Sequence, residues 1–363
     1  MSHIDAVSER LDDYLAANDL EAVWFARPSS FAWLTGGSNI VDRAADVGVA
    51  AAGYDGDGVT VVTDNIEAGR LVDEELPDDV TVETVQWYEA DLDDAVERYS
   101  PTPAAADFDV AGFETVDPTD LRQPLTDRDI ERFRSLGEDA AEVVEAVVGE
   151  ASADDEEREV GGRLRDRLFA RGIDSPVVLV GSGERTRKYR HYTTRDSELG
   201  DYALVSVTAV RDGLHASITR SVAFDAPEWL DDRTEAAMRV EASALAATQR
   251  VGRDGGTAGE MFDAIAEAYA AVGYEGEWRN HHQGGAAAYA GREWFGTPDS
   301  EASVHLPMSY AYNPTVQGAK SEDTHLVTDD GIELLTATGD WPTETVEPVG
   351  DGPALERHAV LHR

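Results

Sequence analysis

The chain has 363 residues, with 30 Lys and Arg against 73 Asp and Glu, which gives a formal net charge of −43 at pH 7. A surface this acidic repels phosphates and anionic lipid headgroups, so it excludes a nucleic-acid clamp and a protein that binds membrane surfaces. Lys188 and Lys320 are the only lysines. This composition is typical of proteins from salt-loving organisms, because molar salt shortens the Debye length to about 3 Å and screens self-repulsion.

The absence of cysteine excludes disulfides, thiolate zinc sites and cysteine nucleophiles, so any metal ligands would be His, Asp or Glu. No run of 18 apolar residues occurs. The first residues are acidic and amphipathic, without the basic and apolar regions of a signal peptide. We therefore expect a cytoplasmic protein.

The first part of the chain alternates between helix and strand patterns. Apolar residues about one helical turn apart predict a helix over 4–17, and Val and Ala runs on both sides of a Gly/Asp turn at 53–58 predict two buried strands. A further strand is expected within 77–87. The alternation predicts a small α/β domain over residues 1–120, and prolines interrupt the periodicity within 116–129.

The second part combines long helices with strands. Thr126 and Asp129 stand where an N-cap could lie, before a long apolar helical stripe. Further helices are predicted over roughly 156–171, 231–250 and 257–272, with β-branched strands between them and a strand-rich stretch at 281–338. The pattern predicts an α+β domain over residues 121–350 and a short C-terminal tail over residues 351–363.

Two stretches carry a series of short motifs. They are RHYTTRDSELGDYALVSVTAVRDGLHASITRSVAF at 190–224 and AYNPTVQGAKSEDTHLVTDDGIELLT at 311–336. Their order resembles the pita-bread family, which includes Xaa-Pro aminopeptidases, prolidases, methionine aminopeptidases and creatinase. The resemblance covers most of the chain. It implies a pita-bread catalytic domain preceded by a smaller creatinase-type N-terminal domain.

Most metal ligands of that family are missing. The resemblance implies two aspartates, one histidine and two glutamates around two divalent ions, but the aspartate positions hold Ser206 and Ser217 and the first glutamate position holds Asn313. Glu322 keeps a carboxylate, and the histidine falls at His282 or Gln283. The ligand charge drops from about −4 to about −1, which cannot neutralise two adjacent dications. We therefore expect no dinuclear metal centre and no metal cofactor.

Resemblance to creatinase implies that a metal-free site can still act. Its catalytic histidine corresponds to His191 and its late glutamate to Glu322, and His282 is a third catalytic candidate. A histidine, with a pKa of about 6.5, can remove a proton from water at neutral pH. A neighbouring carboxylate can orient the imidazole or hold a cationic nitrogen of the substrate.

Several other polar residues are candidates for substrate binding, each with a purely structural alternative. Adjacent histidines on a strand point to opposite faces, so one of His281 and His282 can face a pocket. The full set of substrate-binding candidates is His281, Gln283, Arg292, Glu293, Arg187 and Arg190. Arginines of the basic run could hold a substrate carboxylate; alternatively they pair with surplus acids on the surface.

Three hypotheses follow. The leading one is a metal-independent hydrolase that breaks a C–N bond in a small amino-acid-derived or guanidino substrate. The alternatives are an Xaa-Pro metallopeptidase acting on short peptides with one Mn, Co or Zn ion, and a non-catalytic binding module. The resemblance also implies a homodimer.

Overall fold

The computed structural model of the chain describes residues 3–363. The chain divides into two compact units, with the division between Gln123 and Pro124. This point lies inside the proline-interrupted segment 116–129.

The first unit is a six-stranded mixed sheet with helices, as the alternating pattern predicted. Its elements are α1 (His3–Ala17), β1 (Ala22–Phe25), α2 (Pro28–Thr35), β2 (Ala50–Tyr54), β3 (Val59–Asp64), α3 (Ala68–Arg70), the π-helical η1 (Leu71–Glu75), β4 (Thr81–Val85), α4 (Leu92–Tyr99), β5 (Ala104–Ala106) and β6 (Glu114–Thr115). The strand order is β4-β3-β2-β1-β5-β6. The expected pair of buried strands is the antiparallel pair β2 and β3, which lies in the core because its Ala and Val side chains carry no polar groups.

The second unit begins with two helices and a β-hairpin. Its elements are α5 (Asp127–Glu150), α6 (Glu157–Phe169), β7 (Asp174–Ser182), α7 (Gly183–Lys188), β8 (Tyr202–Arg211), β9 (Leu214–Ala223), α8 (Leu230–Arg253), α9 (Ala258–Ala271), η2 (Glu277–Asn280), β10 (Gly284–Ala286), β11 (Met308–Tyr312), β12 (Thr315–Val316), β13 (Ala319–Lys320), β14 (Asp323–Val327), β15 (Ile332–Leu334), β16 (Thr343–Val346), β17 (Leu355–His358) and β18 (Leu361–His362). The four predicted helices are confirmed as α5, α6, α8 and α9. Helix α5 starts with a capping box in which Thr126 and Asp129 each satisfy a backbone N–H of the other residue.

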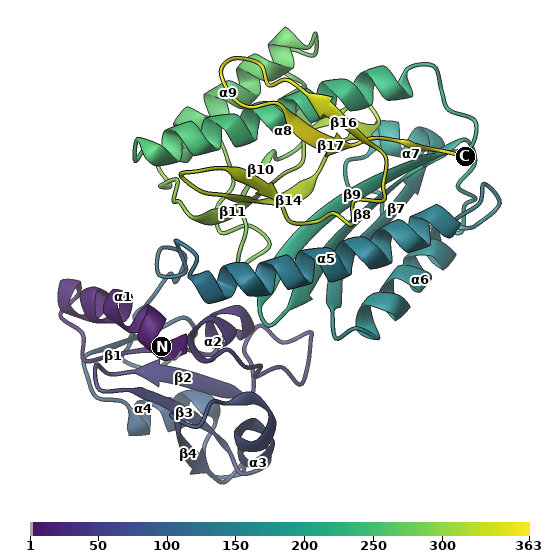
Figure 1. Cartoon of the computed structure of the whole chain (residues 1–363). Helices are drawn as coiled ribbons and strands as arrows, with labels where there is room; N and C mark the ends of the chain where they lie inside the picture. Colours follow the sequence, from purple (N-terminus) through teal and green to yellow (C-terminus); the bar gives the residue numbers. More distant parts are fainter. Residues whose placement is uncertain (1–2) are drawn as a thin grey trace. The chain divides into compact units, whose positions relative to one another are not determined.

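Two four-stranded sheets form the middle of the second unit. Their strand orders are β18-β9-β8-β7 and β10-β11-β14-β15. Helices α5 and α6 lie along one side of these sheets, and α8 and α9 lie along the other (Figure 1). The sheets are joined where the N–H of Thr219 donates to the carbonyl of Glu322 over 2.9 Å and the N–H of Ser217 donates to Thr324 Oγ1 over 2.8 Å. This junction places β9 and the start of β14 side by side and so positions the candidate site.

Residues 351–363 do not form a separate tail. Strand β17 pairs with β16, and β18 pairs with β9 in parallel. The side chain of Arg357 is completely buried and donates to Glu241 over 2.6 Å and to Asp323 over 2.9 Å. These contacts are the physical reason that the expected tail belongs to the second unit.

A buried ionic network underlies the sheet junction. Arg220, on β9, donates to Glu145 of α5 over 2.7 Å and to Asp323 of β14 over 2.9 Å. His358 contributes a further contact of 2.8 Å to Asp323. Because buried charges are stable only when they are paired and hydrogen-bonded, this network ties the four elements α5, β9, β14 and β17 together in one arrangement. Arg220 therefore supports β9 through buried hydrogen bonds.

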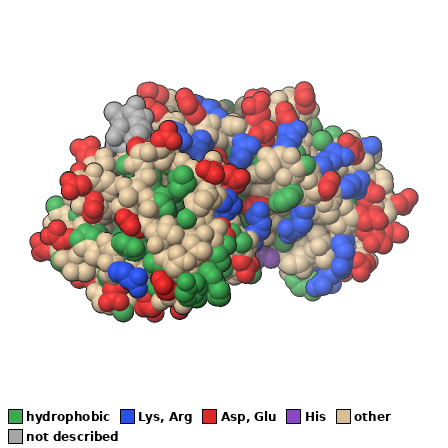
Figure 2. All heavy atoms as spheres, turned by 90° about the horizontal axis from the view of Figure 1, so that it is seen from below, with side chains coloured by type: hydrophobic (Ala, Val, Ile, Leu, Met, Phe, Trp, Pro, Cys, Tyr) green, Lys and Arg blue, Asp and Glu red, His purple; other side chains and the backbone are tan. Residues whose placement is uncertain are grey.

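Acidic side chains are spread over the face shown in Figure 2, while Lys and Arg gather towards its middle and one side. This distribution leaves no continuous basic stripe on that face. In the described residues, no helix combines the length and the apolar character that crossing a membrane requires.

Candidate active site

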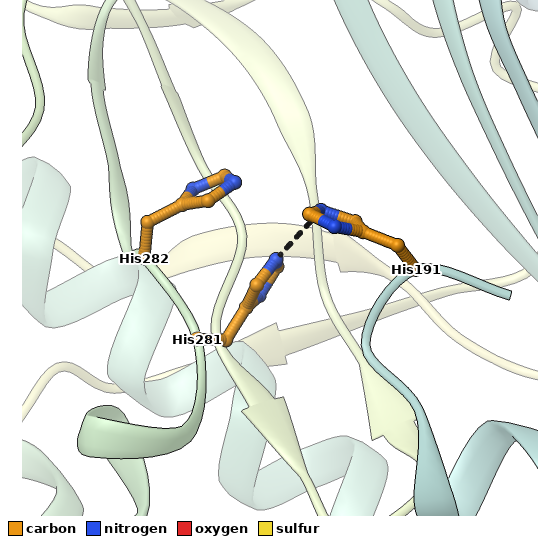
Figure 3. Close-up of side chains that lie close together, drawn as sticks. All are labelled: His191, His281 and His282. Carbon is orange, nitrogen blue, oxygen red and sulfur yellow. Dashed lines mark hydrogen bonds between the residues drawn. The ribbon is translucent and has the colours of Figure 1, made fainter.

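Three histidines from two segments form a cluster in the second unit, which we call the histidine cluster. His191 follows α7, whereas His281 and His282 follow η2. The Nε2 atoms of His191 and His281 lie 3.2 Å apart, and the ring centroids of His281 and His282 lie 4.2 Å apart. One ligand nitrogen of each ring lies within 4.8 Å of the others. Figure 3 shows the three rings directed toward one another.

The expectation that His281 and His282 point to opposite faces is wrong. Both rings contact His191. The alternation of side chains depends on pairing in a pleated sheet, and β10 begins only at Gly284. The two histidines precede that strand, so the sheet does not impose opposite directions on them.

Burial and nearby positive charges keep two of these imidazoles neutral. Desolvation, together with the charge of Lys320, lowers the pKa of His281 to about 2. Desolvation, together with the charge of Arg292, lowers the pKa of His282 to about 4. At neutral pH both rings therefore keep a free nitrogen lone pair. Because Lys320 affects both pKa values, the histidine cluster and Lys320 belong to one electrostatic environment.

Glu322 lies between two side-chain cations, and we call Lys320, Glu322 and Arg292 the ion triad. Lys320 Nζ lies 2.6 Å from Glu322 Oε2, and Arg292 Nη2 lies 3.2 Å from Oε1. Thr219 Oγ1 also donates to Oε2, over 2.8 Å. All three side chains of the triad are at most 7% exposed. Two positive charges against one negative charge leave an excess of one positive charge.

Each cation of the triad also donates to one of the two serines singled out from the sequence. Lys320 Nζ donates to Ser206 Oγ over 3.3 Å, and Arg292 Nη1 donates to Ser217 Oγ over 3.1 Å. Burial by itself would raise the pKa of Glu322, but the charges of Lys320 and Arg292 outweigh burial and lower it. Glu322 is therefore a carboxylate at neutral pH.

Residues 131–329, more than half of the chain, match the metallopeptidase family M24. The chain belongs to this family. It is 25% identical over 229 residues to the Xaa-Pro dipeptidase of Pyrococcus horikoshii, an alignment that spans 60% of this chain and 64% of the relative. The chain thus matches less than two thirds of the length of that curated relative.

Solved structures of other proteins share the fold. The prolidase from Pyrococcus furiosus superimposes with a TM-score of 0.72 at 21% identity, over 90% of this chain and 99% of that one. The N-terminal domain of the FACT complex subunit SPT16 from chickpea gives a TM-score of 0.67 at 12% identity, over 93% and 97%. These likenesses confirm the predicted pita-bread architecture, and they leave the activity open because one fold serves different functions.

The residues of this M24 protein do not fit the two divalent ions that the family name and the resemblance imply. The expected carboxylate positions hold the hydroxyls of Ser206 and Ser217, and cationic groups are hydrogen-bonded to both. A divalent ion about 4 Å from the ammonium of Lys320 would be repelled by about 8 kcal/mol at an effective dielectric constant of about 20. Glu322 is already neutralised by Lys320 and Arg292.

Asn313, at the first expected glutamate position, lies beside the histidine cluster. Its Nδ2 is 3.5 Å from Nδ1 of His282, and its Oδ1 is buried without a hydrogen-bond partner in the described part of the chain. The side-chain amide of Gln283 makes different contacts. Its amide oxygen accepts from Tyr269 over 2.9 Å and its amide nitrogen donates to the carbonyl of His281 over 2.7 Å, so it braces the segment that carries the histidines.

Three remaining candidates for substrate binding contact residues that belong to neither the ion triad nor the histidine cluster. Arg190 pairs with Glu277 over 2.6 Å, and Arg187 lies over the ring of Trp229. Glu293 accepts from the N–H of Ala290 over 3.1 Å. The pairing of Arg190 with an acid corresponds to the structural alternative given for the basic run.

Sequence reasoning missed Lys320 as a site residue. One signal was available, because Lys320 is one of two lysines in the chain and stands two residues before Glu322. A lysine that is only 6% exposed, in a chain otherwise depleted of lysine, indicates a specific role. Its partner Arg292 was identified as a candidate, but the ion pair with Glu322 depends on the fold.

Proposed function

We propose that this M24 protein is a metal-independent hydrolase that breaks a C–N bond in a small amino-acid-derived substrate with a carboxylate group. The observation that carries this proposal is the ion triad. Two buried cations, Lys320 and Arg292, are hydrogen-bonded to Ser206 and Ser217 at the expected metal-ligand positions and share the single carboxylate of Glu322. Their excess positive charge is complementary to an anionic group of a substrate.

The triad can supply the charge stabilisation that divalent ions supply in metallopeptidases. Addition of water to an amide or amidine carbon leads to a tetrahedral intermediate, and in the amide case the carbonyl oxygen becomes negative. Fixed cations in a water-poor site stabilise such charge without reorganising during the reaction. Lys320 and Arg292 meet this condition because Glu322, Ser206 and Ser217 hold them in place.

The histidine cluster can supply the general base. In one tautomer, Nε2–H of His191 donates to Nε2 of the neutral His281, which leaves Nδ1 of His191 free to take a proton from water. The hydroxide adds to the carbon, and the proton then passes to the leaving nitrogen as the C–N bond breaks. The acceptor on His281 stabilises the transient positive charge on His191, as an orienting group does in a catalytic triad.

Activity assays with a chelator test this proposal directly. The full-length protein in molar KCl would be offered guanidino acids, N-acyl amino acids and short peptides, with and without EDTA. We expect turnover that is insensitive to EDTA and falls at least about 100-fold in His191→Ala. The matched control is His362→Ala, which removes an exposed histidine bonded to Asp231. Activity that requires added metal, or stabilisation by a ligand without any turnover, would overturn it.

Similarity to Xaa-Pro dipeptidases favours a second candidate, hydrolysis of an Xaa-Pro dipeptide. The C-terminal carboxylate of such a dipeptide would also suit the positive charge of the ion triad. This candidate predicts release of proline from a panel of Xaa-Pro dipeptides. Turnover of these peptides only after addition of Mn or Co would favour the metal-dependent form.

A further inference from the structure

We propose that the histidine cluster of His191, His281 and His282 binds one first-row transition-metal ion. This site differs from the family's dinuclear centre. His191 and His281 are not aligned with any ligand of that centre, and His282 is one of the two residues aligned with its histidine. The three imidazoles come from two segments that are 90 residues apart in the chain, and they converge on one point (Figure 3).

The spacing of the nitrogens fits a metal ion. Two imidazole nitrogens at about 2.0–2.1 Å from a tetrahedral ion lie about 3.3 Å apart. The Nε2 atoms of His191 and His281 are separated by 3.2 Å. The ligand atoms of all three rings lie within 4.8 Å of one another. The nitrogen of His282 therefore has to move by about 1.5 Å to reach the spacing of a tetrahedral site. His282 is exposed, and a side-chain rotation supplies this movement.

Two buried polar atoms beside the cluster lack partners in the described chain, namely His281 Nδ1 and Asn313 Oδ1. Such atoms are exceptions in folded proteins and mark places where a ligand completes the hydrogen bonding. Oxygen and nitrogen of an amide are exchanged by a flip. After a flip, Asn313 Oδ1 accepts a hydrogen bond from Nδ1–H of His282. Nε2 of that ring is then free to bind the metal. Metal-binding histidines commonly donate their other ring N–H to a neighbouring group in this way.

The donor set selects the kind of metal. Three imidazole ligands favour Zn²⁺, Co²⁺, Ni²⁺ or Cu²⁺ over Mg²⁺, Ca²⁺ and Mn²⁺, which prefer oxygen ligands. The positive charges of Lys320 and Arg190 oppose any cation here, but each is paired with a carboxylate, Glu322 and Glu277 respectively.

Metal binding has a consequence for turnover, and this consequence rests on the proposed function. An ion on Nε2 of His191 removes the contact to Nε2 of His281 that orients the His191 ring as a base. Zn²⁺ would therefore inhibit the hydrolase, whereas EDTA would leave it active or relieve the inhibition.

The test is a titration of the full-length protein with Co²⁺, followed by visible absorption, and with Zn²⁺, followed by calorimetry. We expect one equivalent, with the intense visible bands of a four-coordinate cobalt site. His191→Ala and His282→Ala, which change exposed residues on the two segments, should each weaken binding at least about tenfold. His362→Ala should bind like the wild type.

Three results would overturn the proposal. They are no saturable binding, binding unchanged in both His191→Ala and His282→Ala, and an equal loss in His362→Ala. A thermal melt of each variant checks that the fold is retained, and Asn313→Ala, which should weaken Zn²⁺ binding without touching an imidazole, provides a second measurement. Because the readout is binding, this test is independent of turnover, and either proposal can fail alone.

Discussion

Lys320 Nζ lies 2.6 Å from Glu322 Oε2, and Arg292 Nη2 approaches the other oxygen of the same carboxylate to within 3.2 Å. Lys320 stands two positions before Glu322 in the sequence, whereas Arg292 stands thirty positions before Glu322, on a different segment. The arrangement replaces the expected attraction between carboxylates and metal ions by ion pairs within the chain. It determines both the stability and the electrostatics of the site.

Glu322→Gln should destabilise the second unit strongly. The variant leaves two buried cations without their only shared carboxylate, and breaking such a pair costs about 3–5 kcal/mol of the free energy of unfolding. Chemical denaturation measures this loss. The matched control is Glu333→Gln, since Glu333 forms an exposed ion pair with Arg134 and should cost less than about 1 kcal/mol. Equal losses in the two variants would contradict the role of the triad.

Lys320→Met should raise the pKa of both His281 and His282. The positive charge of Lys320 disfavours protonation of each ring, so its removal eases protonation. NMR titration of the histidine ring protons gives the direction, and Lys188→Met is the control, because Lys188 forms an exposed pair with Glu184. Unchanged values in Lys320→Met would show that Lys320 does not act on the histidine cluster.

The stability of the protein should fall as the pH falls below about 6.5, in part through His282. Desolvation, together with Arg292, lowers its pKa to about 4 in the folded state, whereas the unfolded chain takes up this proton near pH 6.5. Between these values the unfolded state binds more protons, so lower pH favours unfolding. Denaturation between pH 7 and pH 4 should show a weaker pH dependence in His282→Ala than in the wild type. An identical dependence would refute this assignment, and His362→Ala serves as the control.

Arg357→Met should destabilise the second unit by about 3–5 kcal/mol. Arg357 is fully buried and pairs with both Glu241 and Asp323, so the variant leaves two carboxylates facing each other. The control is Arg134→Met, in the exposed pair with Glu333. Denaturation curves that coincide for Arg357→Met and the wild type would mean that the last strands do not contribute to the core.

The local structure was readable from the sequence because it depends on neighbouring residues. The apolar stripe after Thr126 predicted helix α5, and the Val and Ala runs predicted β2 and β3, since periodicity and capping act over a few residues. Pairing of the last strands was not predicted. The residues of 351–363 pair with β9 and with buried carboxylates far away in the chain, and no local pattern encodes those partners.

The sequence by itself carries a motif series that resembles the pita-bread family, and that resemblance predicts that serines and an asparagine replace most of the expected carboxylates. Only the tertiary structure shows which charged groups lie around the positions where carboxylate ligands were expected. Lys320 and Arg292 meet at Glu322, and His191 meets His281 and His282, because β9 and β14 lie side by side and two loops converge. Such long-range contacts depend on the packing of the whole unit, which no single segment specifies.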